Sequence, residues 1–67
     1  MANLWELSTS EKIRILMLRN KTKTDTLAKK LGMWPQGLNY DLRRNSWNIR
    51  KLKIVADFYK IKIADLV

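Results

Sequence analysis

The chain has 67 residues, the length of one small domain, and it carries 14 Lys and Arg against 6 Asp and Glu. It contains no cysteine and no histidine, which excludes disulfides, thiolate metal sites and the commonest general base. The six carboxylates are spread singly, so we expect no enzyme, no metal, no cofactor and no small-molecule substrate. The formal net charge of +8 favours a polyanionic partner, nucleic acid before membrane, with a merely soluble basic surface as the alternative.

The N-terminal region shows no targeting signal, and no apolar run approaches the roughly 18 residues that span a bilayer. We therefore expect a cytoplasmic protein with no membrane partner. Residues 1–7 form a short lead-in whose Leu4, Trp5 and Leu7 are apolar enough to pack against the body.

The first predicted helix opens with Ser8-Thr9-Ser10-Glu11, which fits the S-x-x-E capping box. It extends to about Arg19, and its inward stripe is Ile13, Leu16 and Met17, widened by Ile15 and Leu18. A second helix is expected over about 24–31, with Thr22 or Thr24 as N-cap and Leu27, Ala28 and Leu31 buried. Gly32 then stands where a left-handed C-cap residue belongs.

A third helix is predicted to begin at Pro35, whose missing N–H costs nothing in a first turn, and to end at residues 44–46. Leu38 and Leu42 give it one apolar edge. Asn48 or Ser46 caps a fourth helix over about 49–59, with its inward set at Ile49, Leu52, Val55, Ala56 and Tyr59. A short last helix is expected around 63–67. The prediction is one all-α domain over 1–67, a compact five-helix fold.

Residues 24–44 combine a helix of about eight residues, a short turn containing Gly and a second short helix, which is the pattern of a helix-turn-helix. At about 100° per residue, the third helix places Tyr40 opposite its buried edge, with Gln36, Arg43 and Arg44 on the same outer face and Asn39 on the flank. Gln and Asn can pair with adenine, and Arg can pair with guanine or bind phosphate. Alternatively, these residues form only a solvated helix face.

Other basic and aromatic residues surround this unit. Lys21 and Lys23 enter the second helix and Arg43 and Arg44 end the third, so these four are expected to contact phosphate, and Arg50 could touch the flanking backbone. Trp34 and Trp47 bracket the third helix. They could stack on single-stranded bases, but we expect hinge and core packing, with Trp34 the more exposed of the two.

The chain resembles the Cro/Xre-type (lambda-repressor-like) helix-turn-helix domain over about residues 10–67. The resemblance rests on Leu27-Ala28, on Leu31-Gly32-Met33, on Leu38 and on the spacing of Leu52, Ala56 and Leu66. More narrowly, SEKIRILMLRNK, LAKKLGMWPQGLNYDLRRNSW and LKIVADFY are similar to a phage- and mobile-element-associated subgroup.

This resemblance implies five helices, with the second and third forming the DNA-binding unit, and a repressor-like regulator that often binds paired half-sites as a dimer. It implies contacts at Thr24, Gln36 and Tyr40, with Pro35, Asn39 and Arg43 as neighbours. It also implies a bacterial or phage-infected host cell, where the protein would associate with the nucleoid.

Three residues depart from the family pattern. Thr24 stands where Gln is frequent, which leaves phosphate bonding but no bidentate contact. Asp41 stands at a usually apolar position, so Leu42 is expected to take its core role on a slightly rotated helix. Gly37 replaces larger polar residues and either permits close packing or is neutral.

Two other classes of function stay open. The same fold could be a protein-interaction module, such as an anti-repressor, an antitoxin-like protein or an inhibitor, whose basic face docks on an acidic protein. It could also bind RNA or a single strand through Trp34 and Tyr40. The preferred prediction is sequence-specific binding of double-stranded DNA, with residues 35–44 in the major groove.

Overall fold

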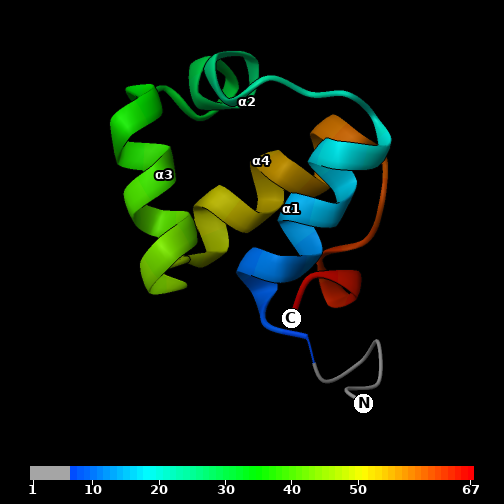
Figure 1. Ribbon diagram of the computed structural model, residues 1–67. Helices are drawn as coiled ribbons and strands as arrows, with labels where there is room; N and C mark the ends of the chain where they lie inside the picture. The colour runs from blue at the N-terminus through cyan, green and yellow to red at the C-terminus, as the bar shows by residue number, and fades with distance from the viewer. Residues whose placement is uncertain (1–6) are drawn as a thin grey trace.

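The computed structural model describes residues 7–67, which form an all-helical domain (Figure 1). In chain order its elements are α1 (Thr9–Arg19), α2 (Thr24–Leu31), α3 (Pro35–Arg44), α4 (Ile49–Tyr59) and the 3-10 turn η2 (Ile63–Asp65). The radius of gyration is 11.1 Å, close to the roughly 11 Å expected of a compact chain of this length. The described residues contain no β-strand and no helix that is long and apolar enough to cross a bilayer.

The predicted fifth helix is replaced by the single turn η2. Its backbone closes on short-range bonds, because Asp65 N–H donates to Lys62 O at 3.0 Å and Leu66 N–H donates to Ile63 O at 2.8 Å. The side chain of Leu66 is fully buried, which fixes this turn against the core. Residues 7–67 therefore hold four α-helices rather than the five that the sequence and the resemblance predicted.

The predicted helix ends are largely confirmed. Ser8 caps α1 by accepting from Glu11 N–H at 3.2 Å, and Asn48 caps α4 by accepting from Lys51 N–H at 2.9 Å. Gly32 ends α2 in the left-handed conformation at φ 69° and Pro35 is the first residue of α3, so both helix breakers act as predicted.

The N-cap prediction for α2 was wrong. Lys23 is the N-cap and makes no side-chain capping bond, and Thr24 is already the first helical residue. Thr22 lies one residue before the N-cap, and its Oγ1 accepts a hydrogen bond from the Tyr59 hydroxyl at 3.0 Å. Burial raises the pKa of Tyr59, and the bond to Thr22 opposes part of that increase.

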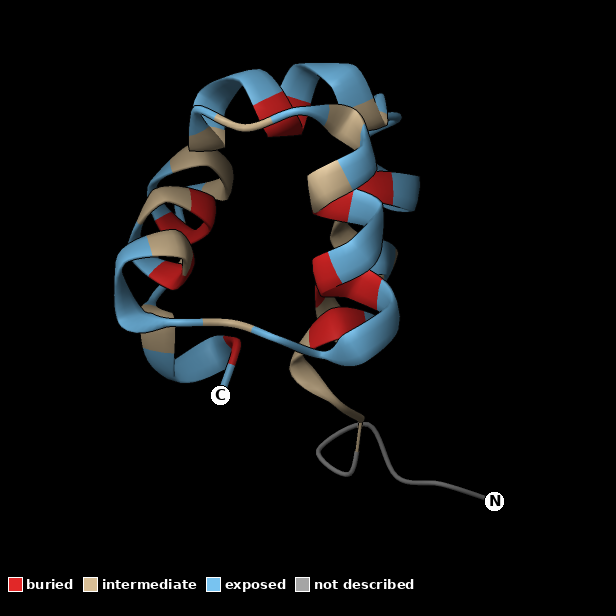
Figure 2. Ribbon diagram, turned by 90° about the vertical axis from the view of Figure 1, so that its left-hand side faces the viewer, coloured by how far each residue is buried: buried red, intermediate tan, exposed pale blue. Residues whose placement is uncertain are grey.

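The core lies between the inner faces of the helices, while their outer faces are exposed (Figure 2). The buried apolar residues are Ile13, Met17, Leu27, Ala28, Leu38, Leu42, Leu52, Val55, Ala56 and Leu66. Two residues within the helices were predicted to face the core and are exposed instead. Leu18 is 81% exposed because it lies about 140° around α1 from Ile13. Ile49 is 64% exposed because, as the first residue of α4, its side chain leans beyond the packed body.

A polar junction joins the start of α1 to the segment between α3 and α4. Asn45 ends α3 in the left-handed conformation, and its Oδ1 accepts from the Ser10 backbone N–H at 3.0 Å. Trp47 donates its Nε1–H to Ser10 Oγ at 2.9 Å while its ring packs against the core. The predicted core role of Trp47 is thus confirmed, and the junction fixes where α3 ends.

The first residues described also lie against the body. Leu7 is half-buried, as predicted, whereas Leu4 and Trp5 lie outside the described residues and their packing stays a prediction. Thr9 Oγ1 donates to the Leu66 carbonyl at 2.8 Å, which ties the start of α1 to the end of the described chain.

Candidate nucleic-acid interface

Helix α3 forms one edge of the molecule, with α2 crossing its upper end (Figure 1). Its inner side is anchored by Leu38, which is fully buried, and by Asp41 and Leu42, which are each 6% exposed. Because these three positions lie on one side of a helix, the opposite side must face solvent. The structure therefore presents a whole helical face outward on a firmly packed base.

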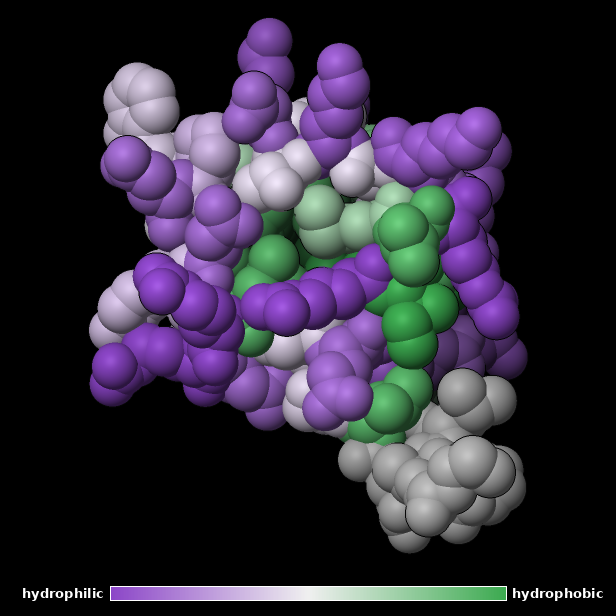
Figure 3. All heavy atoms as spheres, viewed as in Figure 1, coloured by the Kyte–Doolittle hydropathy of each residue, from purple (hydrophilic) through white to green (hydrophobic). Residues whose placement is uncertain are grey.

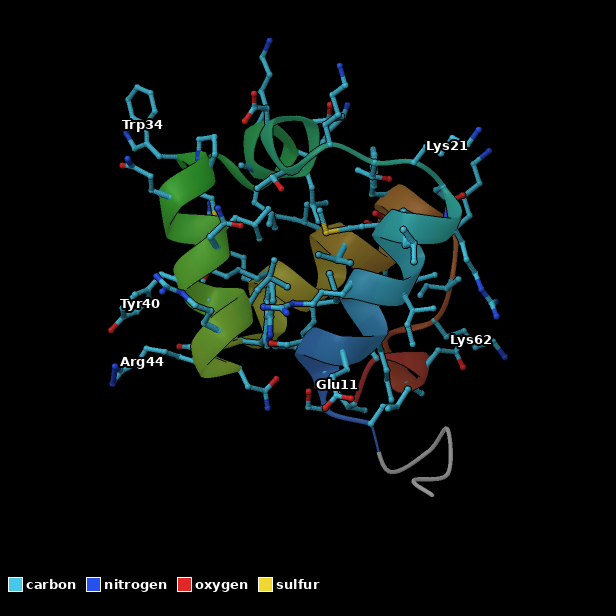
Figure 4. All side chains as sticks on the ribbon, viewed as in Figure 1. Glu11, Lys21, Trp34, Tyr40, Arg44 and Lys62 are labelled. Carbon is cyan, nitrogen blue, oxygen red and sulfur yellow. The ribbon has the colours of Figure 1, made fainter. Side chains whose placement is uncertain are left out.

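Five polar or charged side chains occupy the outward surface of α3. All of them are exposed: Gln36, Asn39, Tyr40, Arg43 and Arg44. In Figure 4, Tyr40 and Arg44 project together away from the body. The Arg44 guanidinium lies over the Tyr40 ring, with its central carbon 5.2 Å from the ring centroid, a cation–π arrangement that restrains both side chains. The predicted outer face of the helix is confirmed as a surface.

Asp41 is buried as well as Leu42, and it has a partner that the sequence did not reveal. Lys51 Nζ, at the start of α4, donates to Asp41 Oδ2 at 2.6 Å. It is the one ion pair found within residues 7–67. It joins the C-terminal half of α3 to α4, so the unusual acidic residue acts as a clamp between these helices.

Two segments that carry predicted phosphate contacts, the starts of α2 and α4, border α3. Thr24 and Asn39 line the same hollow, which places the start of α2 along one flank of α3. Asp41, about 200° around the helix from Asn39, meets Lys51, which places the start of α4 and the exposed Arg50 along the other flank. Basic segments thus border α3 on two sides.

The residues that lead into α2 differ in their accessibility. Lys21 and Lys23 are exposed, and Thr24 is half-buried at the first position of α2. In Figure 4, Lys21 lies on the side of the molecule away from Tyr40. The structure therefore does not bring Lys21 next to the outer face of α3, although Lys21 lines the hollow that Asn39 also lines.

This hollow, of about 440 Å³, lies between α1, the start of α2 and α3. Its floor contains apolar residues of the body, Met17 and Leu42, and its rim carries Arg14, Leu18 and Lys21. Figure 3 shows apolar side chains exposed on this face, bordered by hydrophilic ones. We did not predict Arg14 or Leu18 as surface residues of interest. The sequence did contain a signal for them. Arg14 and Leu18 are four residues apart, which places both side chains on one flank of the inward stripe that contains Met17.

Trp34 contradicts the core packing that we expected of it. It is 81% exposed, because it is the N-cap of α3 and its extended backbone, φ −76° and ψ 150°, directs the side chain outward. In Figure 4 it projects from the turn between α2 and α3. Its neighbour in sequence, Met33, packs partly against the core.

Gly37 packs its backbone close to Met33. A Cβ added at Gly37 would lie 3.1 Å from Met33 Cε, which is the flexible end of a side chain rather than backbone. The position therefore allows a close contact without demanding glycine.

No group of three potential metal ligands occurs in residues 7–67.

Comparisons with known proteins give no further guide to this surface. No protein-family model matches the chain, and neither a curated protein nor a solved structure matches it.

Proposed function

We propose that the protein binds double-stranded DNA in a sequence-specific manner, as a repressor-like transcriptional regulator of phage or mobile-element type. In this proposal α2, the turn at residues 32–34 and α3 are a helix-turn-helix of the lambda-repressor-like type, and α3 enters the major groove. The observation that carries the proposal is the outer face of α3, where side chains suited to base contacts are exposed above a buried anchor.

Base recognition is assigned to the middle of this face. Gln36 and Asn39 can each make a bidentate contact with adenine, and Arg43 can make one with guanine. Tyr40 offers a ring for a thymine methyl group, and the guanidinium stacked on that ring limits the positions it samples. Holding the side chains still lowers the entropy lost on binding.

Phosphate contacts are assigned to the two flanks. A major groove is bordered by two phosphate backbones, and a helix inside it needs cations on both sides. On one side we assign Lys21, Lys23 and Thr24, and on the other Arg50, with Arg44 at the end of α3. The net charge of +8 supports binding to a polyanion in general but carries no sequence information.

Selection of binding sites from random duplex DNA tests the proposal. The expected result is one enriched sequence, and a palindromic sequence with half-sites about one helical turn apart would identify binding as a homodimer. Failure to retard any duplex at low salt, where nonspecific binding is strongest, would contradict the proposal and favour a protein-interaction module.

A second candidate function is binding of single-stranded nucleic acid, and the exposure of Trp34 is the observation that favours it. Trp34 is 81% exposed and lines a surface hollow with Lys29, so its indole offers a stacking platform for a base beside a cation. Competition between a duplex and its separated strands distinguishes the two functions. A single strand that displaces the duplex, with this displacement lost in Trp34→Ala, would favour the second function.

A further inference from the structure

The hollow between α1, the start of α2 and α3 has properties that a solvated surface does not need. Two cationic side chains, Arg14 and Lys21, stand on its rim, and no acidic residue lines it. Both cations are exposed. Neither takes part in the ion pair found within residues 7–67, which joins Lys51 to Asp41. The rim is therefore a site of uncompensated positive charge above an apolar floor.

An exposed leucine shares this rim. Leu18 is 81% exposed and follows Arg14 by one helical turn on α1, so the two side chains lie on the same flank of the helix. A cation beside an apolar group suits a ligand that alternates anionic and apolar parts. The sugar–phosphate backbone of DNA alternates in this way, with charged phosphates and the carbon face of each deoxyribose.

We infer that this hollow holds one DNA backbone segment, with Arg14 and Lys21 on its phosphates and Leu18 against a deoxyribose. The inference rests on the proposed function and extends the interface from α2 and α3 to α1. Thr24 and Asn39 line the same hollow as the rim residues. A DNA strand whose phosphates lie along this flank of α3 would therefore continue past the rim. Arg14 becomes a phosphate contact outside the helix pair.

The experiment measures duplex affinity against salt concentration for the wild type, Arg14→Gln and Arg19→Gln. Arg19 is the matched control, because it is an exposed arginine of α1 that lines a separate surface pocket with Leu7 and Ile61. One phosphate contact contributes about 0.9 to the slope of log affinity against log salt concentration, which changes the affinity about eight-fold for each tenfold change in salt. We expect Arg14→Gln to lose this contribution to the salt slope on selected and random duplexes alike, and we expect Arg19→Gln to keep the wild-type slope.

Ethylation interference locates the contact, and far-ultraviolet circular dichroism verifies that each variant is folded. One phosphate whose ethylation weakens the wild type should cease to matter in Arg14→Gln. If Arg14→Gln behaves as Arg19→Gln does while Gln36→Ala still loses base discrimination, the hollow does not hold the backbone although the proposed function stands. If the wild type binds no duplex, both proposals fail together.

Discussion

The ion pair between Asp41 and Lys51 predicts an unequal response to the loss of either partner. The Nζ to Oδ2 distance is 2.6 Å, and the Asp41 side chain is 9% exposed whereas that of Lys51 is 29% exposed. Lys51→Met keeps the aliphatic stem but leaves a carboxylate with little access to water. Asp41→Ala leaves an ammonium group that can turn toward the solvent. The first substitution should therefore cost more than the second.

The magnitudes follow from these exposures. Removing one partner of a fully buried ion pair costs about 3–5 kcal/mol, and partial exposure reduces this figure. We expect Lys51→Met to lower the free energy of unfolding by about 2 kcal/mol and Asp41→Ala to lower it by about 1 kcal/mol. The double variant should resemble Asp41→Ala, because no unpaired carboxylate remains. The coupling free energy of the cycle is then about 2 kcal/mol.

Urea unfolding followed by circular dichroism measures all four proteins of this cycle. Lys53→Met is the control, because Lys53 is an exposed lysine of the same helix, and its effect should stay within about 0.5 kcal/mol. The reasoning would be refuted if Lys51→Met cost no more than Lys53→Met. Additive effects in the double variant would refute it equally, because they would mean that the two charges do not stabilise each other.

Two further predictions concern Tyr59 and Gly37. The pKa of Tyr59 is raised above its ordinary value of 10.0, so the folded state keeps the proton at a pH where the unfolded state has lost it. The contribution of Tyr59 to stability is fully present below pH 10 and declines as the pH rises toward the raised pKa of the folded state. Near neutral pH we expect the wild type to be about 1 kcal/mol more stable than Tyr59→Phe. Urea titrations at higher pH should show this difference shrinking. Gly37→Ala should raise the free energy of unfolding by up to about 1 kcal/mol in the same assay, because Met33 Cε can move aside. A loss of stability in Gly37→Ala would instead mean that the helix contact is rigid.

The features that the sequence predicted correctly depend on local chemistry. Gly32 and Pro35 bound the turn between α2 and α3 through their own backbone preferences, and the period of Leu38 and Leu42 identifies the inner edge of α3. The outer face of α3 follows from that edge by helical geometry alone. This is why the surface residues could be named before the structure was known.

The features that it missed depend on contacts between distant elements. The partner of Asp41 is ten residues away on α4, and the position of that lysine depends on how α3 and α4 pack. Thr22 does not cap α2; its hydroxyl instead accepts a hydrogen bond from Tyr59, which lies 37 residues further along the chain. Leu18 appeared to widen an apolar stripe, but it faces solvent beside Arg14 at the hollow. Local patterns carry no information on such pairings.

The central claim is that α3 reads bases, and titration of Gln36→Ala against a selected site and all its single-base variants tests it most directly. Lys23→Ala is the matched comparison, because it removes a proposed phosphate contact from the same unit. The account predicts that Gln36→Ala loses about 1–3 kcal/mol of discrimination at one base position, whereas Lys23→Ala weakens every duplex alike and flattens the salt dependence. Unchanged discrimination at every position in Gln36→Ala, with binding otherwise intact, would contradict it.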